Sequence, residues 1–118
     1  MKILIADDEA DIRMLLALSL GEIAGASIVE ARNGREAVAV AEREQPDLIV
    51  LDAIMPGMSG PDAVPLIRVV SPSSTIYLFS AISNTQLEDY GRSLGVLVYP
   101  KTRIPDLIEK ITALACSA

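Results

Sequence analysis

Five short runs of apolar residues recur at wide intervals along the chain, and each is too short to form a helix of ordinary length. Within a run the apolar side chains follow one another instead of alternating with polar ones, and β-branched residues are frequent. This continuity is typical of strands that are buried on both faces in a parallel sheet. The pattern predicts strands over residues 3–6, 27–29, 48–51, 75–79 and 96–99.

The stretches between these runs are long enough for helices, and the spacing of their apolar residues supports that assignment. The predicted helices cover a segment that starts at residue 12 and frays over residues 21–25, residues 37–45, a segment that starts at residue 59, residues 83–94 and residues 104–115. Residues 83–86 have the spacing of a capping box, and Pro65 should kink or shorten the third helix. The apolar stripe of the first helix consists of Ile12, Leu15, Leu16, Leu20 and Ile23.

Strands and helices therefore alternate five times, with no internal repeat and no linker between them. Alternation of this kind predicts one α/β domain over residues 1–118, with a doubly wound parallel sheet and right-handed crossovers.

Composition narrows the chemistry. The 118 residues contain no histidine and one cysteine, Cys116, which excludes a Ser-His-Asp triad, a zinc site built on histidine or several cysteines, and an internal disulfide. A net charge of −6 disfavours nucleic acid and anionic membranes as direct partners. No apolar run approaches the ~20 residues that span a bilayer, and no targeting segment is visible at the N-terminus. The sequence predicts a soluble protein of the reducing cytoplasm.

Polar residues follow four of the five predicted strands. Because ligands of open α/β sheets bind beyond the carboxyl ends of the strands, these residues should converge, and crowded carboxylates favour a hard cation such as Mg²⁺. The residues concerned are Asp7, Asp8, Glu9, Asp52, Ser80, Ala81 and Lys101.

Each of these residues also has an ordinary structural explanation when it is taken alone. Asp8 or Glu9 could cap the first helix, Ser80 could be a turn hydroxyl, and Lys101 could be a solvated surface lysine. Asp52 differs because it directly follows an apolar strand and precedes Ala53-Ile54-Met55-Pro56-Gly57, so no helix begins there for it to cap. The placement of all these polar residues at the ends of neighbouring strands favours a functional site.

Four short motifs in the expected order resemble those of the receiver domains of response regulators. They are Ile-Ala-Asp-Asp-Glu at residues 5–9, Asp-Ala-Ile-Met-Pro-Gly-Met-Ser-Gly at 52–60, Phe-Ser-Ala at 79–81 and Tyr-Pro-Lys at 99–101. Together they span essentially the whole chain. The resemblance implies a flavodoxin-like sheet in the order 2-1-3-4-5.

The resemblance also implies roles for the site residues. Asp52 would accept a phosphoryl group from a phosphohistidine on a partner histidine kinase or phosphotransfer protein. Asp7, Asp8, the Asp52 carboxylate and the backbone carbonyl of Ile54 would hold Mg²⁺. The phosphoryl oxygens would bind Lys101, the Ser80 hydroxyl and the backbone N–H of Ala81.

The fifth-strand segment departs from the family pattern. The family has Lys-Pro, whereas this chain has Pro100-Lys101-Thr102. The aromatic switch residue of the family lies three positions before the lysine, where this chain has Val98, and Tyr99 lies on the other strand face. A one-residue bulge at Pro100 would bring Tyr99 back to the switch face, so Ser80, Val98 and Tyr99 are the switch candidates.

Two further hypotheses concern apolar side chains. Ile54 and Ile82 lie two positions after Asp52 and Ser80, where they would hinder a hydrolytic water and slow dephosphorylation. Met14 and Leu18 lie four residues apart on the outward flank of the first helix. They are either ordinary exposed side chains or a contact surface for a partner.

The function predicted is a phosphoacceptor domain that switches the face formed by its fourth helix, fifth strand and fifth helix. This face would act on a downstream protein or an output domain absent from this chain, or form a phosphorylation-dependent dimer. An alternative is a receiver-like scaffold in which phosphorylation no longer reaches the output face. A metal-dependent phosphohydrolase is disfavoured because Ile54 stands where a second acid would be needed.

Overall fold

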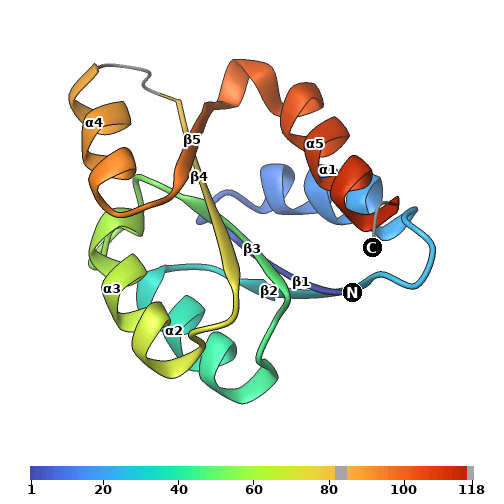
Figure 1. The fold of residues 1–118 in the computed structure, drawn as a ribbon, viewed down its shortest axis with the longest axis horizontal. Helices are drawn as coiled ribbons and strands as arrows, with labels where there is room; N and C mark the ends of the chain where they lie inside the picture. Colours follow the sequence, from blue (N-terminus) through green and yellow to red (C-terminus); the bar gives the residue numbers. More distant parts are fainter. Residues whose placement is uncertain (82–84, 117–118) are drawn as a thin grey trace.

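The computed structural model describes residues 1–81 and 85–116 and has the predicted doubly wound α/β architecture (Figure 1). The sheet is parallel, with strand order β2-β1-β3-β4-β5. The strands are β1 (Lys2–Ala6), β2 (Ser27–Ala31), β3 (Leu48–Asp52), β4 (Thr75–Ser80) and β5 (Leu97–Pro100).

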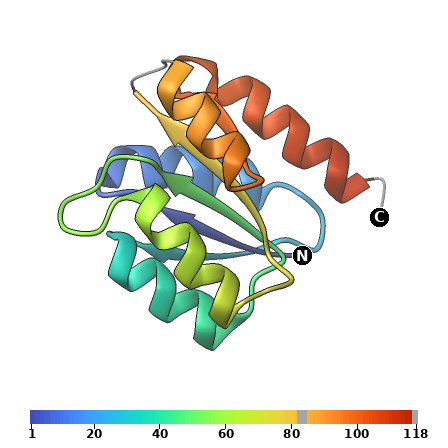
Figure 2. The same cartoon turned by 60° about the vertical axis from the view of Figure 1, so that its left-hand side comes forward.

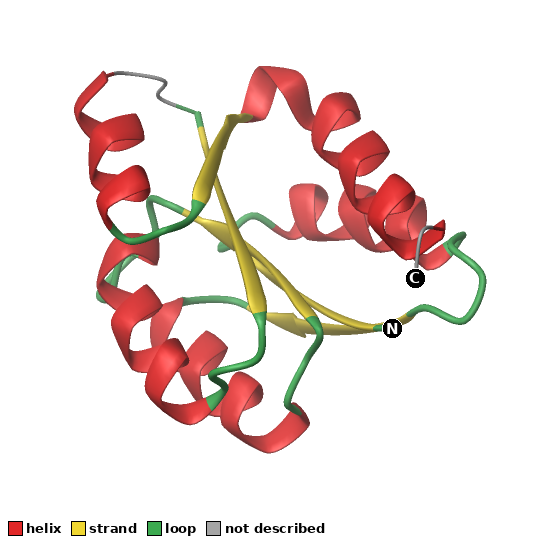
Figure 3. Ribbon diagram, in the orientation of Figure 1, coloured by secondary structure: helices red, strands yellow, loops and turns green. Residues whose placement is uncertain are grey.

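The helices cover both faces of this sheet (Figures 2 and 3). Helices α1 and α5 pack on one face, and α2, α3 and α4 pack on the other. Their bounds are α1 (Ala10–Gly21), α2 (Gly34–Glu44), α3 (Gly60–Val70), α4 (Thr85–Ser93) and α5 (Ile104–Cys116), with a 3-10 turn at Lys101–Arg103.

Successive residues of the central strands enter two separate cores. Ile3 and Ile5 pack under α1 and α5 with Leu107, whereas Leu4 and Leu51 pack under α2 and α3. Every residue of β3 is buried, so the unbroken apolar runs of the sequence reflect strands with no solvent-facing side. None of the described helices is long and apolar enough to cross a membrane.

Local capping explains where the helices on the second face begin. The Asn33 side chain accepts a hydrogen bond from the Glu36 backbone at 2.8 Å, and the Ser59 hydroxyl accepts one from the Asp62 backbone at 3.2 Å. Pro65 does not shorten α3, which continues to Val70. A proline in the second turn removes one intrahelical hydrogen bond, and of the residues that follow it in α3 only Ile67 is buried.

Several predicted boundaries were wrong by one or two residues. Asp52, Ser80 and Pro100 belong to their strands, and β2 extends to Ala31. Leu15 is exposed, so the apolar stripe of α1 is narrower than predicted. The predicted capping box at residues 83–86 lies largely outside the described residues.

Candidate functional site

Asp52 ends the central strand β3 and is buried. Its Oδ1 atom accepts a hydrogen bond from the Ile54 backbone N–H at 3.2 Å, which fixes the carboxylate against its own loop. Helix α3 begins beside this carboxylate, since a Cβ atom on Gly60 would collide with the carbonyl oxygen of Asp52. The return of the chain to α3 therefore requires glycine, and the loop after Asp52 is held close to the strand end.

Asp7 follows the neighbouring strand β1 and is fully buried. Its Oδ1 atom accepts a hydrogen bond from the Glu9 backbone at 2.8 Å, and its backbone carbonyl accepts one from Arg13 at 2.8 Å. The buried Oδ2 atom accepts no hydrogen bond from any residue that the structure describes. The Lys101 ammonium, 3.2 Å away, gives this oxygen an ion-pair contact, and a metal ion would compensate further for the cost of burying it.

A cation fits this position. Asp7, Asp8 and Asp52 each offer one carboxylate oxygen, and the three oxygens lie within 4.8 Å of one another. Asp8 is exposed and so provides an open side from which an ion and its waters can enter. An all-oxygen, partly open donor set of this kind suits Mg²⁺, which keeps several waters when it binds.

Lys101 completes the cluster from the segment after β5. Its Nζ atom lies 3.2 Å from Asp7 Oδ2, 3.3 Å from Asp52 Oδ2 and 3.3 Å from Glu9 Oε1. It also lies 5.2 Å from the ring centroid of Phe79, and its side chain is only 13% exposed. The ammonium group is therefore confined among carboxylates at the sheet edge.

Burial and crowding perturb the charges of this cluster. Burial, together with the charge of Asp7, raises the pKa of Asp52 from 3.8 to about 7, despite the opposing effect of Lys101. Burial also raises the pKa of Asp7. Burial alone would lower the pKa of Lys101, but the charges of Asp52 and Asp7 outweigh it and raise that pKa. Without a cation, the two buried carboxyl groups do not readily ionise together.

Ser80 and Ala81 lie next to Asp52 on the adjacent strand. Asp52 is in register with Phe79, so Ser80 extends one residue beyond it toward the open edge. Ser80 is buried and Ala81 is exposed. The sheet thus brings Ser80 and Ala81 to the edge that Asp7, Asp52 and Lys101 share.

The pairing of β4 with β5 shows on which face of the sheet each switch candidate lies. Phe79 pairs with Tyr99 and Ser80 pairs with Pro100 without interruption, so the strand has no bulge at Pro100. Tyr99 consequently stays on the α5 side, where its ring meets that of Tyr77 edge to face at 6.0 Å. The idea that Tyr99 returns to the face of Ser80 was wrong, because continuous pairing keeps alternate residues on opposite faces.

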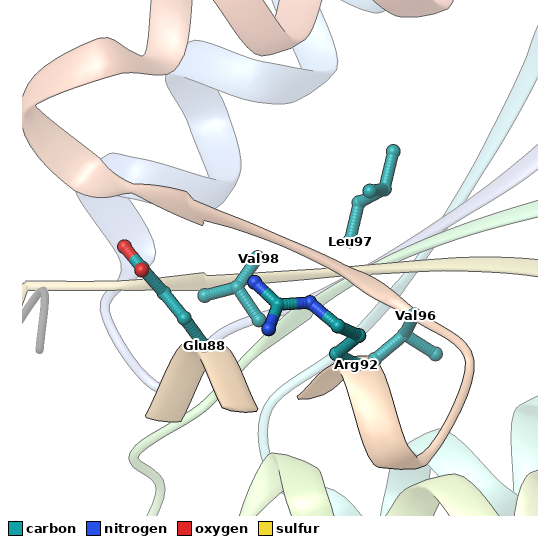
Figure 4. A pocket seen from close by; sticks show the side chains of 5 residues that line it. All are labelled: Glu88, Arg92, Val96, Leu97 and Val98. Atoms are coloured by element: carbon teal, nitrogen blue, oxygen red, sulfur yellow. The ribbon is translucent and has the colours of Figure 1, made fainter. Parts of the chain in front are cut away.

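Val98 occupies the face on which a switch residue was expected. It packs against the α4 side of the core, and a Cβ atom on Gly91 of α4 would collide with it. A pocket of about 190 Å³ lies beside it, lined by Glu88, Arg92, Val96, Leu97 and Val98 (Figure 4). This pocket is on the α4–β5 face and is separate from the acidic cluster.

The apolar candidates outside the cluster are accessible. Met14 is 61% exposed and Leu18 is 67% exposed on the outer side of α1, and Leu15 beside them is also exposed. Ile54 is exposed near Asp52, whereas Ile82 lies outside the described residues. These positions are compatible with the two hypotheses made for Met14 and Leu18 and for Ile54.

Comparison with known proteins identifies the family. A family model described as the response regulator receiver domain matches residues 3–99. The chain belongs to this receiver domain family. Transcriptional regulatory protein PdtaR of Mycobacterium tuberculosis is 39% identical to it over 114 residues, covering 93% of this chain and 54% of PdtaR. The receiver domain thus spans about half the length of that relative.

Two further relatives agree with this assignment. Sporulation initiation phosphotransferase F of Bacillus subtilis is 31% identical over 98 residues, covering 83% of this chain and 78% of that protein. Among solved structures, chemotaxis protein CheY4 of Vibrio cholerae is similar, with a TM-score of 0.84, 27% identity and 97% coverage of both chains. The receiver fold, including the predicted strand order, is confirmed.

Two contacts of the site were not predicted from the sequence. Arg13 supports the backbone at Asp7 and also pairs with Glu30 at 3.3 Å. The carboxylate of Glu9 reaches Lys101, which is 92 residues away along the chain. The position of Arg13, six residues after a strand-end aspartate, was the available sequence signal for the first contact. Nothing in the sequence indicates the second.

Proposed function

We propose that this receiver domain accepts a phosphoryl group on Asp52 in a reaction that depends on Mg²⁺. The observation that supports this function best is the convergence of a buried strand-end carboxylate, a three-aspartate oxygen cluster and the Lys101 ammonium at one sheet edge. Membership of the receiver family, whose members are signalling domains rather than classical enzymes, supports this proposal.

Membership of the receiver family suggests a phosphohistidine as the donor, and since this chain has no histidine, a partner would supply it. An Asp52 oxygen forms a bond to phosphorus while the phosphorus–nitrogen bond of the donor breaks. The electron pair of that bond stays on the imidazole, which leaves the site with a proton from solvent. A histidine kinase or a phosphotransfer protein is thus the partner class, and the reaction takes place in the cytoplasm.

The residues around Asp52 would stabilise the negative charge on the phosphoryl oxygens during this transfer. Lys101 binds one phosphoryl oxygen, and the Ser80 hydroxyl with the Ala81 N–H binds another. Asp7, Asp8, the Asp52 carboxylate and the carbonyl of Ile54 would hold Mg²⁺. When bound, this ion supplies positive charge that offsets the carboxylates and the incoming phosphoryl oxygens.

The output would arise at the face formed by α4, β5 and α5. Ser80 and Val98 lie toward α4, and the pocket beside Val98 offers a site that a small movement of α4 would reshape. Such a change would alter binding to a downstream protein, to an output domain or to a second copy of the domain.

A scaffold function is the second candidate, and the position of Tyr99 favours it. Because Tyr99 packs on the α5 side, a rotation of Tyr99 toward Ser80 cannot couple phosphorylation to the α4 face. In that case Asp52 would be phosphorylated without a change at this face.

One experiment separates the candidates. The protein is incubated with Mg²⁺ and acetyl phosphate, and the covalent adduct is measured by mass spectrometry in wild type, Asp52→Asn and the control Asp62→Asn, which changes a carboxyl group in the first turn of α3. The proposal expects an adduct in wild type and in the control only. Nuclear magnetic resonance with beryllofluoride then shows whether α4 and β5 respond. An unchanged α4–β5 face supports the scaffold, and no Asp52-dependent adduct refutes both functions.

A further inference from the structure

Within residues 1–81 and 85–116, Glu9 is the one carboxylate around Lys101 that the proposed metal and phosphoryl chemistry does not use. Its Oε1 atom lies 3.3 Å from Lys101 Nζ, whereas the cation-binding group consists of Asp7, Asp8 and Asp52. The contact joins the start of α1 to the segment after β5, so it connects opposite ends of the chain within the site.

The Glu9 side chain has no structural role in capping α1. Glu9 occupies the N-cap position, but its side chain makes no capping hydrogen bond, and only its backbone carbonyl receives the Arg13 N–H at 3.1 Å. The carboxylate instead extends to Lys101, although its side chain is 60% exposed. Because the Glu9 carboxylate is exposed, water alone could solvate it in other orientations. The ion pair with Lys101 therefore accounts for the orientation of this side chain.

Charge counting shows the consequence for phosphoryl transfer. An ammonium group has three donors, and Lys101 has three carboxylate partners within 3.3 Å. A cation held by the three aspartates would satisfy Asp7 and Asp52, which leaves Glu9 as the remaining competitor for Lys101. An incoming phosphoryl oxygen must then share the Lys101 ammonium with Glu9 or displace the Glu9 carboxylate from it. The negative charge of Glu9 also repels this oxygen.

From this geometry, and resting on the proposed function, we infer that Glu9 is a positioning residue that restrains Lys101 and slows phosphorylation of Asp52. Glu9→Gln removes the charge and weakens the competition while leaving the carboxylates that hold the cation unchanged. Because the Glu9 side chain is more than half exposed, the effect is that of a partly solvated ion pair, about two- to fivefold in rate.

The test measures Asp52 phosphorylation by acetyl phosphate at saturating Mg²⁺, using mass spectrometry, in wild type, Glu9→Gln and Glu22→Gln. Glu22 is an exposed residue at the other end of α1, so its replacement makes the same change in net charge away from the site. We expect about two- to fivefold faster phosphorylation in Glu9→Gln and the wild-type rate in Glu22→Gln. Glu9→Ala should change the rate in the same direction as Glu9→Gln.

Two readouts distinguish this role from a general structural effect. The rate advantage of Glu9→Gln should vanish toward 1 M salt, where the screening length falls to ~3 Å. Mg²⁺ affinity, measured by calorimetry, should decrease in the same variant by about twofold or more, because a negative charge near the cation is lost. A damaged site would instead lower both the affinity and the rate.

The outcomes are distinct. If wild type is phosphorylated on Asp52 and Glu9→Gln is no faster, or if Glu22→Gln is equally fast, Glu9 does not restrain Lys101 and the inference is wrong. If wild type itself is not phosphorylated, the proposed function fails, and the inference that rests on it fails as well.

Discussion

Replacing Asp52 by asparagine should stabilise the metal-free protein at alkaline pH. Asp52 is buried beside Asp7, and its pKa is raised from 3.8 to about 7. Below about pH 4 the group is protonated in both the folded and the unfolded protein, so it has no effect on stability. As the pH rises from about 4 to about 7, the unfolded chain loses this proton and the folded protein keeps it, so the free energy of unfolding decreases.

The size of this effect depends on the two pKa values. Their separation, at ~1.36 kcal/mol per pH unit, gives about 4 kcal/mol of lost stability once the pH exceeds 7. The value already includes the opposing attraction of Lys101. Asp52→Asn should therefore exceed wild type by up to about 4 kcal/mol at pH 8, and the two proteins should be nearly equal at pH 4.

The assay is urea unfolding from pH 4 to pH 8 with a chelator present, followed by far-ultraviolet circular dichroism. Glu42→Gln, which removes an exposed carboxylate of α2, serves as the control and should follow wild type at every pH. Saturating Mg²⁺ should narrow the gap at pH 8, because a ligand that binds only the folded state stabilises it. Parallel stability curves of wild type and Asp52→Asn across pH 5–8 would show that Asp52 is not held protonated by its surroundings.

Three further substitutions test other parts of the site. Lys101→Met should lower the free energy of unfolding at pH 8 by about 3 kcal/mol, because it leaves the buried Asp7 and Asp52 carboxylates without the Lys101 ammonium. Urea unfolding measures this change, and a decrease below about 0.5 kcal/mol would contradict the prediction. The double substitution Met14→Ala with Leu18→Ala should slow transfer from a partner kinase about fivefold, the equivalent of ~1 kcal/mol of lost apolar contact. The rate of phosphorylation by acetyl phosphate should stay the same. An unaltered rate of transfer from the kinase would exclude this patch as the docking surface. Ile54→Ser with Ile82→Ser should shorten the half-life of the acyl phosphate, followed by mass spectrometry after donor removal, and an unchanged half-life would refute the water-exclusion hypothesis.

The sheet could be predicted from the sequence because its strands are buried on both faces. Short apolar runs rich in β-branched residues favour such strands, and parallel pairing then brings the strand ends to one edge. The predicted strands ended too early at Asp52 and Ser80 because a polar side chain looks like a loop, although the backbone pairing continues through both residues.

Features that depend on how elements meet were harder to predict. Periodicity places Leu15 on the inner side of α1, but it does not show where the neighbouring helix ends, and Leu15 is exposed. The face of Tyr99 depends on the β4–β5 register, which a single sequence does not specify. The Glu9–Lys101 ion pair requires the positions of two segments from opposite ends of the chain, so it emerges only from the folded structure.

Lys101 lies directly before the last helix, so its position affects the start of that helix. The 3-10 turn Lys101–Arg103 leads directly into α5, a helix of 13 residues. At 1.5 Å per residue the helix is about 20 Å long. A tilt of ~5° at its first residue therefore moves its far end by about 1.7 Å. If phosphorylation shifted the backbone at Lys101, this geometry would enlarge the displacement along α5.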